Sequence, residues 1–216
     1  TIQTDNNLGE QLSIPYFINF SGNKDLTFTP NIQSKANNFY FVNYRHLNEF
    51  GRFNIDTSID DNDDGKGTRN HIFFDAKIFN NLGNLNLTLK TSNNDTYLRK
   101  NKINQLTVHE SGVNFSNNTN YSYLNLKSSS YKHLTIQDDN QWEYIYPKVE
   151  YNIKNFSLLN LNANFSLNND FSYKKKLDRS YTTLASSDLT WSDTNINKKY
   201  GILLNNKANF RVVSIM

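Results

Sequence analysis

The chain has 216 residues, a net charge of +3, a hydrophobic fraction of 37% and a mean hydropathy of -0.71. Its basic residues are spread out, which argues against a nucleic-acid partner, and the absence of cysteine excludes disulfides and thiolate metal sites. An aromatic fraction of 14% is too high for a disordered polar tract, so we expect an ordered fold.

Residues 1–10 are polar and form a predicted lead-in segment. Residues 14–30 then predict an antiparallel hairpin, because apolar and polar positions alternate on both sides of a Gly22-Asn23 turn. A two-residue loop would set Pro15 directly opposite Pro30 but would pair an apolar side with a polar side. We therefore predict a three-residue loop, 22–24, with Pro15 opposite Asn31 and Tyr16 opposite Pro30.

Two of the three prolines of the chain lie in this hairpin, at nearly the same height. Proline has no N–H for the ladder, so sheets tolerate it at edges, strand starts and bulges. One interpretation of Pro15 and Pro30 is an edge hairpin that its prolines protect from aggregation. The other is a weak seam in the sheet that can open.

Including this hairpin, alternation predicts roughly 11 to 12 strands of about ten residues each, and no convincing helix. The clearest apolar row is Leu85, Leu87 and Leu89. The other predicted strands lie at 39–44, 53–59, 72–78, 106–115, 121–127, 142–153, 159–167, 184–191 and 202–212.

Strands of this length with one apolar and one polar row suit a transmembrane β-barrel, with lipid outside and water inside. A soluble sandwich or β-solenoid is the alternative, although its strands are usually shorter. Aromatic residues near strand ends would suit the girdles at the two membrane interfaces, although aromatics also favour strands in general. These are Tyr97, Tyr121, Trp142 and Tyr144.

The acidic loop 60–67 matches the front of a calcium-binding loop at Asp60, Asn62, Asp64 and Gly65. The twelfth position, which should be glutamate, is His71, so a solvated acidic turn is the better interpretation. The four histidines have no ligand spacing and are expected to face a lumen or the surface: His46, His71, His109 and His133. No nucleophile motif, zinc-protease motif or phosphate loop occurs, so neither a catalytic residue nor a cofactor is predicted.

The hairpin resembles the first barrel hairpin of the lipopolysaccharide-assembly outer-membrane protein family (LptD, also OstA). The residues that carry the resemblance are Pro15, Tyr16, Phe17, Asn23, Asp25, Thr27, Thr29 and Pro30. Gly9, the run 44–47 (Tyr-Arg-His-Leu) and the run 94–98 (Asn-Asp-Thr-Tyr-Leu) also resemble that family. The similarity is best over residues 9–60, weaker to about 155 and faint beyond.

The resemblance implies an all-β fold in which residues 11–216 form a partial, open antiparallel barrel, a fragment of a larger outer-membrane barrel. It implies a lateral gate at Pro15 and Pro30, through which lipopolysaccharide leaves the lumen for the outer leaflet. Tyr16, Gly22, Asn23 and Asp25 would support the gate hairpin through packing and turn geometry. The implied partners are lipopolysaccharide, outer-membrane lipids, an LptE-like plug lipoprotein and periplasmic lipopolysaccharide-bridge proteins.

Three functions therefore remain open. The first is a conduit in the Gram-negative outer membrane that inserts lipopolysaccharide without bond chemistry, so that the chain is not an enzyme. The second is a passive, porin-like barrel, and the third is a soluble all-β adhesin or carbohydrate-binding protein.

Overall fold

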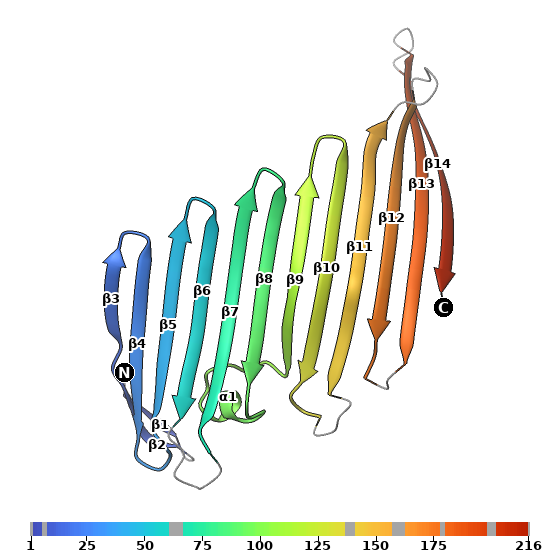
Figure 1. Ribbon diagram of the computed structural model, residues 1–216. Helices are drawn as coiled ribbons and strands as arrows, with labels where there is room; N and C mark the ends of the chain where they lie inside the picture. Colours follow the sequence, from blue (N-terminus) through green and yellow to red (C-terminus); the bar gives the residue numbers. More distant parts are fainter. Residues whose placement is uncertain are drawn as a thin grey trace. The chain divides into compact units, whose positions relative to one another are not determined.

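The computed structural model describes residues 2–5, 8–60, 67–136, 141–156, 163–177, 180–197 and 202–215. Within these residues the chain forms 14 strands and one four-residue helix (Figure 1). The all-β prediction is confirmed and the predicted strand count was too low; the helix found among the described residues is a single turn, in keeping with the expectation of no convincing helix. The elements are β1 (Ile2–Asp5), β2 (Gly9–Ser13), β3 (Tyr16–Ser21), β4 (Lys24–Gln33), β5 (Phe39–Asn48), β6 (Gly51–Asp60), β7 (Arg69–Asn80), β8 (Gly83–Ser92), α1 (Tyr97–Lys100), β9 (Val108–Asn118), β10 (Ser122–His133), β11 (Trp142–Phe156), β12 (Ala163–Lys175), β13 (Tyr181–Asn197) and β14 (Ile202–Ile215).

The strands form one antiparallel sheet in which neighbours along the chain are mostly neighbours in space. The order is β1-β2-β4-β5-β6-β7-β8-β9-β10-β11-β12-β13-β14, and β3 pairs with β4 next to β2. Such an up-and-down order follows from short turns between sequential antiparallel strands. No helix in the described part of the chain is long and apolar enough to cross a membrane.

The chain divides into two compact units. The first contains residues 1–80, 85–113 and 131–142, and the second contains residues 81–84, 114–130 and 143–216.

In the first unit, the register separates apolar from polar side chains onto opposite faces of the sheet. One row of direct cross-strand partners is apolar and runs from β3 to β7: Ile18, Leu26, Tyr44, Ile55 and Phe74. The next row is polar: Asn19, Asp25, Arg45, Asn54 and Asp75. Because successive side chains of a strand point to opposite faces, these two rows lie on opposite sides of the sheet.

The second unit repeats this arrangement in β11–β14. Ile153, Leu167, Leu189 and Phe210 are consecutive partners in an apolar row. The adjacent positions form a polar row, Asn152, Asn168, Asp188 and Arg211, in which Arg211 and Asp188 are 3.4 Å apart as an ion pair. The prediction of one apolar and one polar face is therefore confirmed in each unit.

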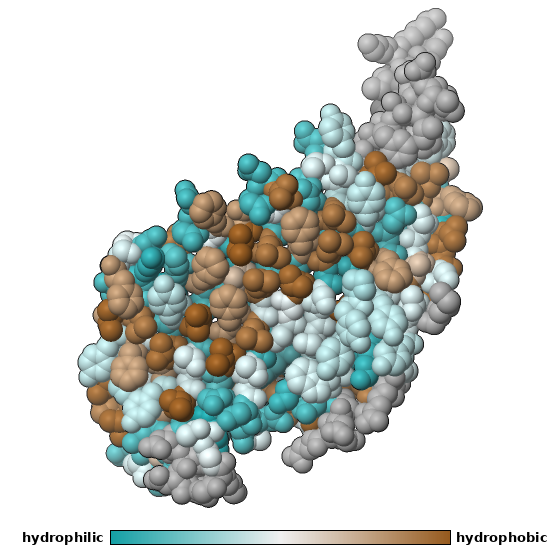
Figure 2. Space-filling view, in the orientation of Figure 1, coloured by the Kyte–Doolittle hydropathy of each residue, from teal (hydrophilic) through white to brown (hydrophobic). Residues whose placement is uncertain are grey.

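The apolar face is exposed instead of packed into a core. In the first unit, Ile18, Ile59 and Ile72 are each exposed by 45–47%. In the second, Phe210 is 67% exposed. Figure 2 shows hydrophobic side chains gathered in this way along the strands on the viewed face. Among the described residues of each unit, the rows of Leu, Ile and Phe thus do not meet in a dry interior.

The small core of the first unit lies on the opposite, polar face, under α1. Phe73 of β7 packs with Tyr97 and Leu98 of the helix, and Ile103 packs against this cluster. Tyr97 and Leu98 are both fully buried. The short helix therefore attaches to the sheet by inserting two consecutive side chains.

Candidate functional site

The first hairpin has a register that sequence reasoning missed. Tyr16 lies opposite Phe28 and Ile18 opposite Leu26, so that Pro15 falls at the level of Thr29 and Pro30 at the level of Ile14. The predicted pairs Pro15–Asn31 and Tyr16–Pro30 are wrong by two residues. The turn is the two-residue Gly22-Asn23, and a bulge between Asn19 and Ser21 adds the residue that keeps apolar partners on one face.

Pro30 removes a hydrogen bond at the junction between β2 and β3. Ile14 N donates to Pro30 O at 3.2 Å, so these two residues form a hydrogen-bonded pair of the antiparallel ladder. In such a pair the second residue normally returns an N–H to the first. Pro30 has no N–H, so the carbonyl of Ile14 lacks its ladder donor at this point.

Pro15 acts differently, because alternate residues of a strand point their backbone groups to opposite sides. With Ile14 directed at β4, the nitrogen of Pro15 faces away from β4. β3 pairs only with β4 among the described strands, so this side is a sheet edge and the ladder loses nothing there. Regular strand structure is nevertheless interrupted at residues 14–15, between the end of β2 at Ser13 and the start of β3 at Tyr16.

Side chains around the prolines hold the hairpin on both faces. On the apolar face the rings of Tyr16, Phe28 and Tyr40 stack in series, with centroid separations of 6.5 and 6.3 Å. On the polar face Asp25 accepts two hydrogen bonds from its cross-strand partner Arg45, at 2.8 and 3.1 Å. Tyr16 therefore packs in this ring stack, and Asp25 joins β4 to β5.

The turn itself depends more on Asn23 than on Gly22. Ser21 Oγ donates to Asn23 Oδ1 at 2.7 Å, and Leu47 N donates to Asn23 O at 2.9 Å. A Cβ built on Gly22 would have open space, and Gly22 is not among the residues with positive φ. A glycine is therefore not required at position 22 on steric grounds.

A polar network lies beside the interrupted strand, on the polar face. Ser13 Oγ donates to Asn31 Oδ1 at 2.5 Å, Gln11 Nε2 donates to the same oxygen at 3.2 Å, and Asn31 Nδ2 donates to Thr29 O at 3.0 Å. These residues also line a cavity of about 280 Å³. Polar groups able to bind water or hydroxyls thus lie beside Pro15 and Pro30 on the polar face of the sheet, and aromatic rings lie beside them on the apolar face.

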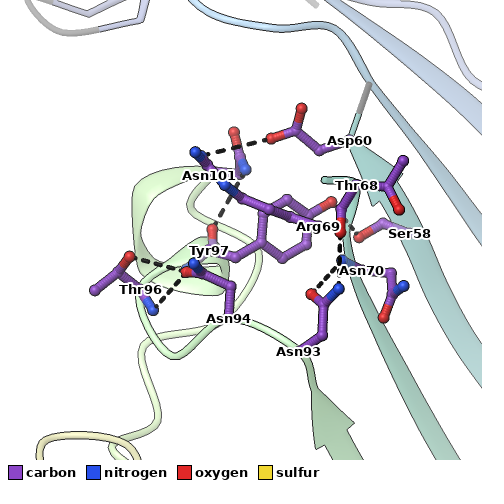
Figure 3. Close-up of polar contacts among 10 residues, drawn as sticks. All are labelled: Ser58, Asp60, Thr68, Arg69, Asn70, Asn93, Asn94, Thr96, Tyr97 and Asn101. Atoms are coloured by element: carbon purple, nitrogen blue, oxygen red, sulfur yellow. Dashed lines mark hydrogen bonds and ion pairs between the residues drawn. The ribbon is translucent and has the colours of Figure 1, made fainter. Parts of the chain in front are cut away.

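The α1 segment is a second feature that sequence reasoning missed. Tyr97 Oη lies 2.7 Å from Ser58 Oγ, which lies 2.6 Å from His71 Nδ1 (Figure 3 shows the first contact). Asn94 Oδ1 accepts hydrogen bonds from Thr96 N and Tyr97 N and so caps the helix start. Burial raises the pKa of the Tyr97 phenol from 10.0 to about 12.

The expectation that Tyr97 belongs to an interfacial girdle is wrong, because its side chain is fully buried.

All four histidines were expected to face a lumen or the surface, but two of them are buried. His71 is 0% exposed and His109 is 1% exposed, and both rings pack on Phe73, at centroid separations of 4.7 and 5.3 Å. No group of three His, Cys, Asp or Glu side chains suited to a metal ion occurs among the described residues. Ser58 contacts a histidine but is only 2% exposed, so a substrate cannot reach its hydroxyl in this arrangement.

The acidic loop that matches the front of a calcium-binding motif lies largely outside the described residues, at positions 61–66. Asp60, at its start, is buried and lies 3.9 Å from Arg69 as an ion pair.

Comparison with known proteins finds no matching family model and no matching curated protein.

Proposed function

We propose that this chain forms part of the wall of an outer-membrane β-barrel that delivers lipopolysaccharide to the outer leaflet. The observation that supports this best is the exposed apolar face opposite a polar face, found in each unit separately. A soluble protein would need to cover such extensive apolar rows, whereas hydrocarbon satisfies them directly. The polar rows would then line the lumen.

Tyrosines in the second unit support a membrane interface at the ends of β11–β13. Tyr144, Tyr146, Tyr173 and Tyr181 form a continuous series of ring contacts with centroid separations of 5.6–5.8 Å. Lys175 Nζ lies 5.6 Å from the centroid of the Tyr144 ring, an arrangement typical of a cation–π contact. Amphipathic rings and snorkelling lysines are the side chains that favour the boundary between hydrocarbon and headgroups.

The proposed exit for lipopolysaccharide is the seam at Pro15 and Pro30. The missing donor of Pro30 faces the interrupted strand, and in hydrocarbon an unsatisfied carbonyl costs several kcal/mol. A seam with such a deficit opens more readily than a complete ladder. Polar groups near Asn31 suit sugar hydroxyls, and the ring stack from Tyr16 to Tyr40 suits acyl chains. The plug lipoprotein and the periplasmic bridge proteins enter this proposal through the family resemblance alone.

The membrane role is tested by placing one lysine on each face. Ile72→Lys adds a charge to the exposed apolar face, and we expect it to lower stability in lipid bilayers by roughly 2–4 kcal/mol if it lies near the midplane. Thr27→Lys, on the polar face opposite Asn43, is the matched control and should change stability little. Refolding into vesicles followed by urea titration measures both. A wild-type protein that is monodisperse in buffer without detergent, with an Ile72→Lys variant of unchanged stability, would refute the membrane role.

The transport role is tested in the full-length protein in its own host. The double variant Pro15→Ala/Pro30→Ala should tighten the seam and reduce the lipopolysaccharide that reaches the cell surface. Unchanged surface lipopolysaccharide would contradict the gate. A photo-crosslinker at Phe17, which is 61% exposed on β3, should capture lipopolysaccharide in a conduit and should capture none in a passive pore.

A further inference from the structure

A charged cavity lies on the polar face of the first unit, at the ends of the strands that carry the first hairpin. Its volume is about 750 Å³, within the range of pockets that bind small organic molecules. The charged side chains that line it are Asp25, Arg45, Arg52, Asp75 and Lys77.

Two cations in this cavity oppose each other directly. Arg52 of β6 and Lys77 of β7 are cross-strand partners, so their side chains leave the sheet on the same face and at the same level. Like charges in this position repel and destabilise a sheet. Within the described residues neither side chain forms an ion pair or a hydrogen bond.

One of the two carboxylates of the cavity is paired with a cation, and the other accepts a hydrogen bond from a neutral hydroxyl. Asp25 binds Arg45 through both oxygens, and Asp75 accepts a hydrogen bond from Thr88 Oγ1 at 3.1 Å. Arg45 uses Nε and Nη2 for Asp25, so its charge is largely balanced by that carboxylate. The three cations and two carboxylates of the cavity give it a formal net charge of +1, and Arg52 and Lys77 are its two cations without an ion pair among the described residues.

We propose that this cavity binds a phosphorylated sugar, with its phosphate between Arg52 and Lys77. A phosphate dianion neutralises both cations at once, and guanidinium groups match its oxygens in bidentate geometry. The cavity has room for a sugar ring beside the phosphate, and the amide of Asn23 at its lining can bind hydroxyl groups. The inference stands on the cavity and its charges and does not rest on the proposed transport function.

The test measures binding to the purified full chain in detergent micelles by calorimetry. Three probes separate the contributions: glucosamine 6-phosphate, glucosamine, and inorganic phosphate. We expect glucosamine 6-phosphate to bind, inorganic phosphate to bind at least about tenfold more weakly, and glucosamine not to bind measurably. Affinity should fall as salt increases, because the attraction is largely electrostatic.

Substitutions of the two cations test whether the phosphate binds between them. Arg52→Gln and Lys77→Gln should each weaken binding of glucosamine 6-phosphate about tenfold or more, and the double variant should abolish it. Arg99→Gln, on the exposed side of α1, is the control and should leave affinity unchanged. Since Arg52→Gln removes a repulsion, its thermal midpoint should stay level or rise, which separates lost binding from lost folding.

The proposal is overturned if glucosamine 6-phosphate does not bind, if glucosamine or inorganic phosphate binds equally well, or if the double variant retains full affinity. Displacement of the bound sugar phosphate by the phosphorylated lipid anchor of lipopolysaccharide would assign a lipid headgroup to the cavity, and lack of displacement would assign a free sugar phosphate. If the double proline variant exports lipopolysaccharide normally, the gate proposal fails, but these binding results are unaffected.

Discussion

Replacing Pro30 with alanine should strengthen the seam locally, and the effect can be estimated from the hydrogen bond that is missing. An alanine at this position would supply an N–H to the carbonyl of Ile14, whose own amide already donates to the carbonyl of Pro30 at 3.2 Å. One additional ladder bond contributes about 1 kcal/mol net, and more where water is excluded. Local opening at this point should therefore become about fivefold less frequent or rarer still.

The matched control is Pro15→Ala. Both substitutions release a proline constraint on the unfolded chain, which lowers global stability by about 0.4–1 kcal/mol. Only Pro30→Ala also gains a ladder bond, because the nitrogen of Pro15 faces the sheet edge. Global melting is a poor readout, since the two effects of Pro30→Ala nearly cancel. Hydrogen exchange at the Ile14 amide is the appropriate assay, with slower exchange expected in Pro30→Ala only. Equal exchange in the two variants would refute this account of the seam.

Three further results are expected. Gly51→Ala should lower stability by several kcal/mol, because φ is +156° there and a Cβ would lie 1.9 Å from a backbone oxygen of the next strand, whereas Gly22→Ala should be neutral in the same urea titration. Tyr97→Phe should cost about 1–2 kcal/mol by removing the bond to Ser58, and a cost near zero would contradict the role of this contact. The Tyr97 phenol, with a folded pKa of about 12 against 10.0 unfolded, stabilises the fold fully below pH 10, and this contribution is lost between pH 10 and about 12. Absorbance titration of phenolate should show one tyrosine that ionises near pH 12 in the wild type and is missing in Tyr97→Phe.

Much of the first hairpin could be predicted from its sequence. The alternation from Ile14 to Phe28 identified two strands with matched apolar sides, but the predicted three-residue loop, 22–24, was wrong, because the loop is the two-residue Gly22-Asn23. The register was missed because a bulge at residue 20 has no signature in the alternation, which continues unbroken through it. As a result, the direction of the missing donor at Pro30 could not be known in advance.

The α1 segment was missed for a related reason. Tyr97 and Leu98 lie in a short polar stretch with too few residues for a helical period, so nothing local indicated that they were buried. Their burial depends on Phe73 and Ser58, which lie on strands far away in the chain.

The amino-acid sequence by itself determined that this chain is a sheet with one apolar and one polar face, because the period of two is a property of each strand alone. Only the tertiary structure decided which residues oppose each other: Pro30 at Ile14, Arg52 at Lys77, and Tyr97 at Ser58. These pairings depend on bulges, turn lengths and long-range packing, whose energies are distributed over several strands, so no single stretch of sequence encodes them.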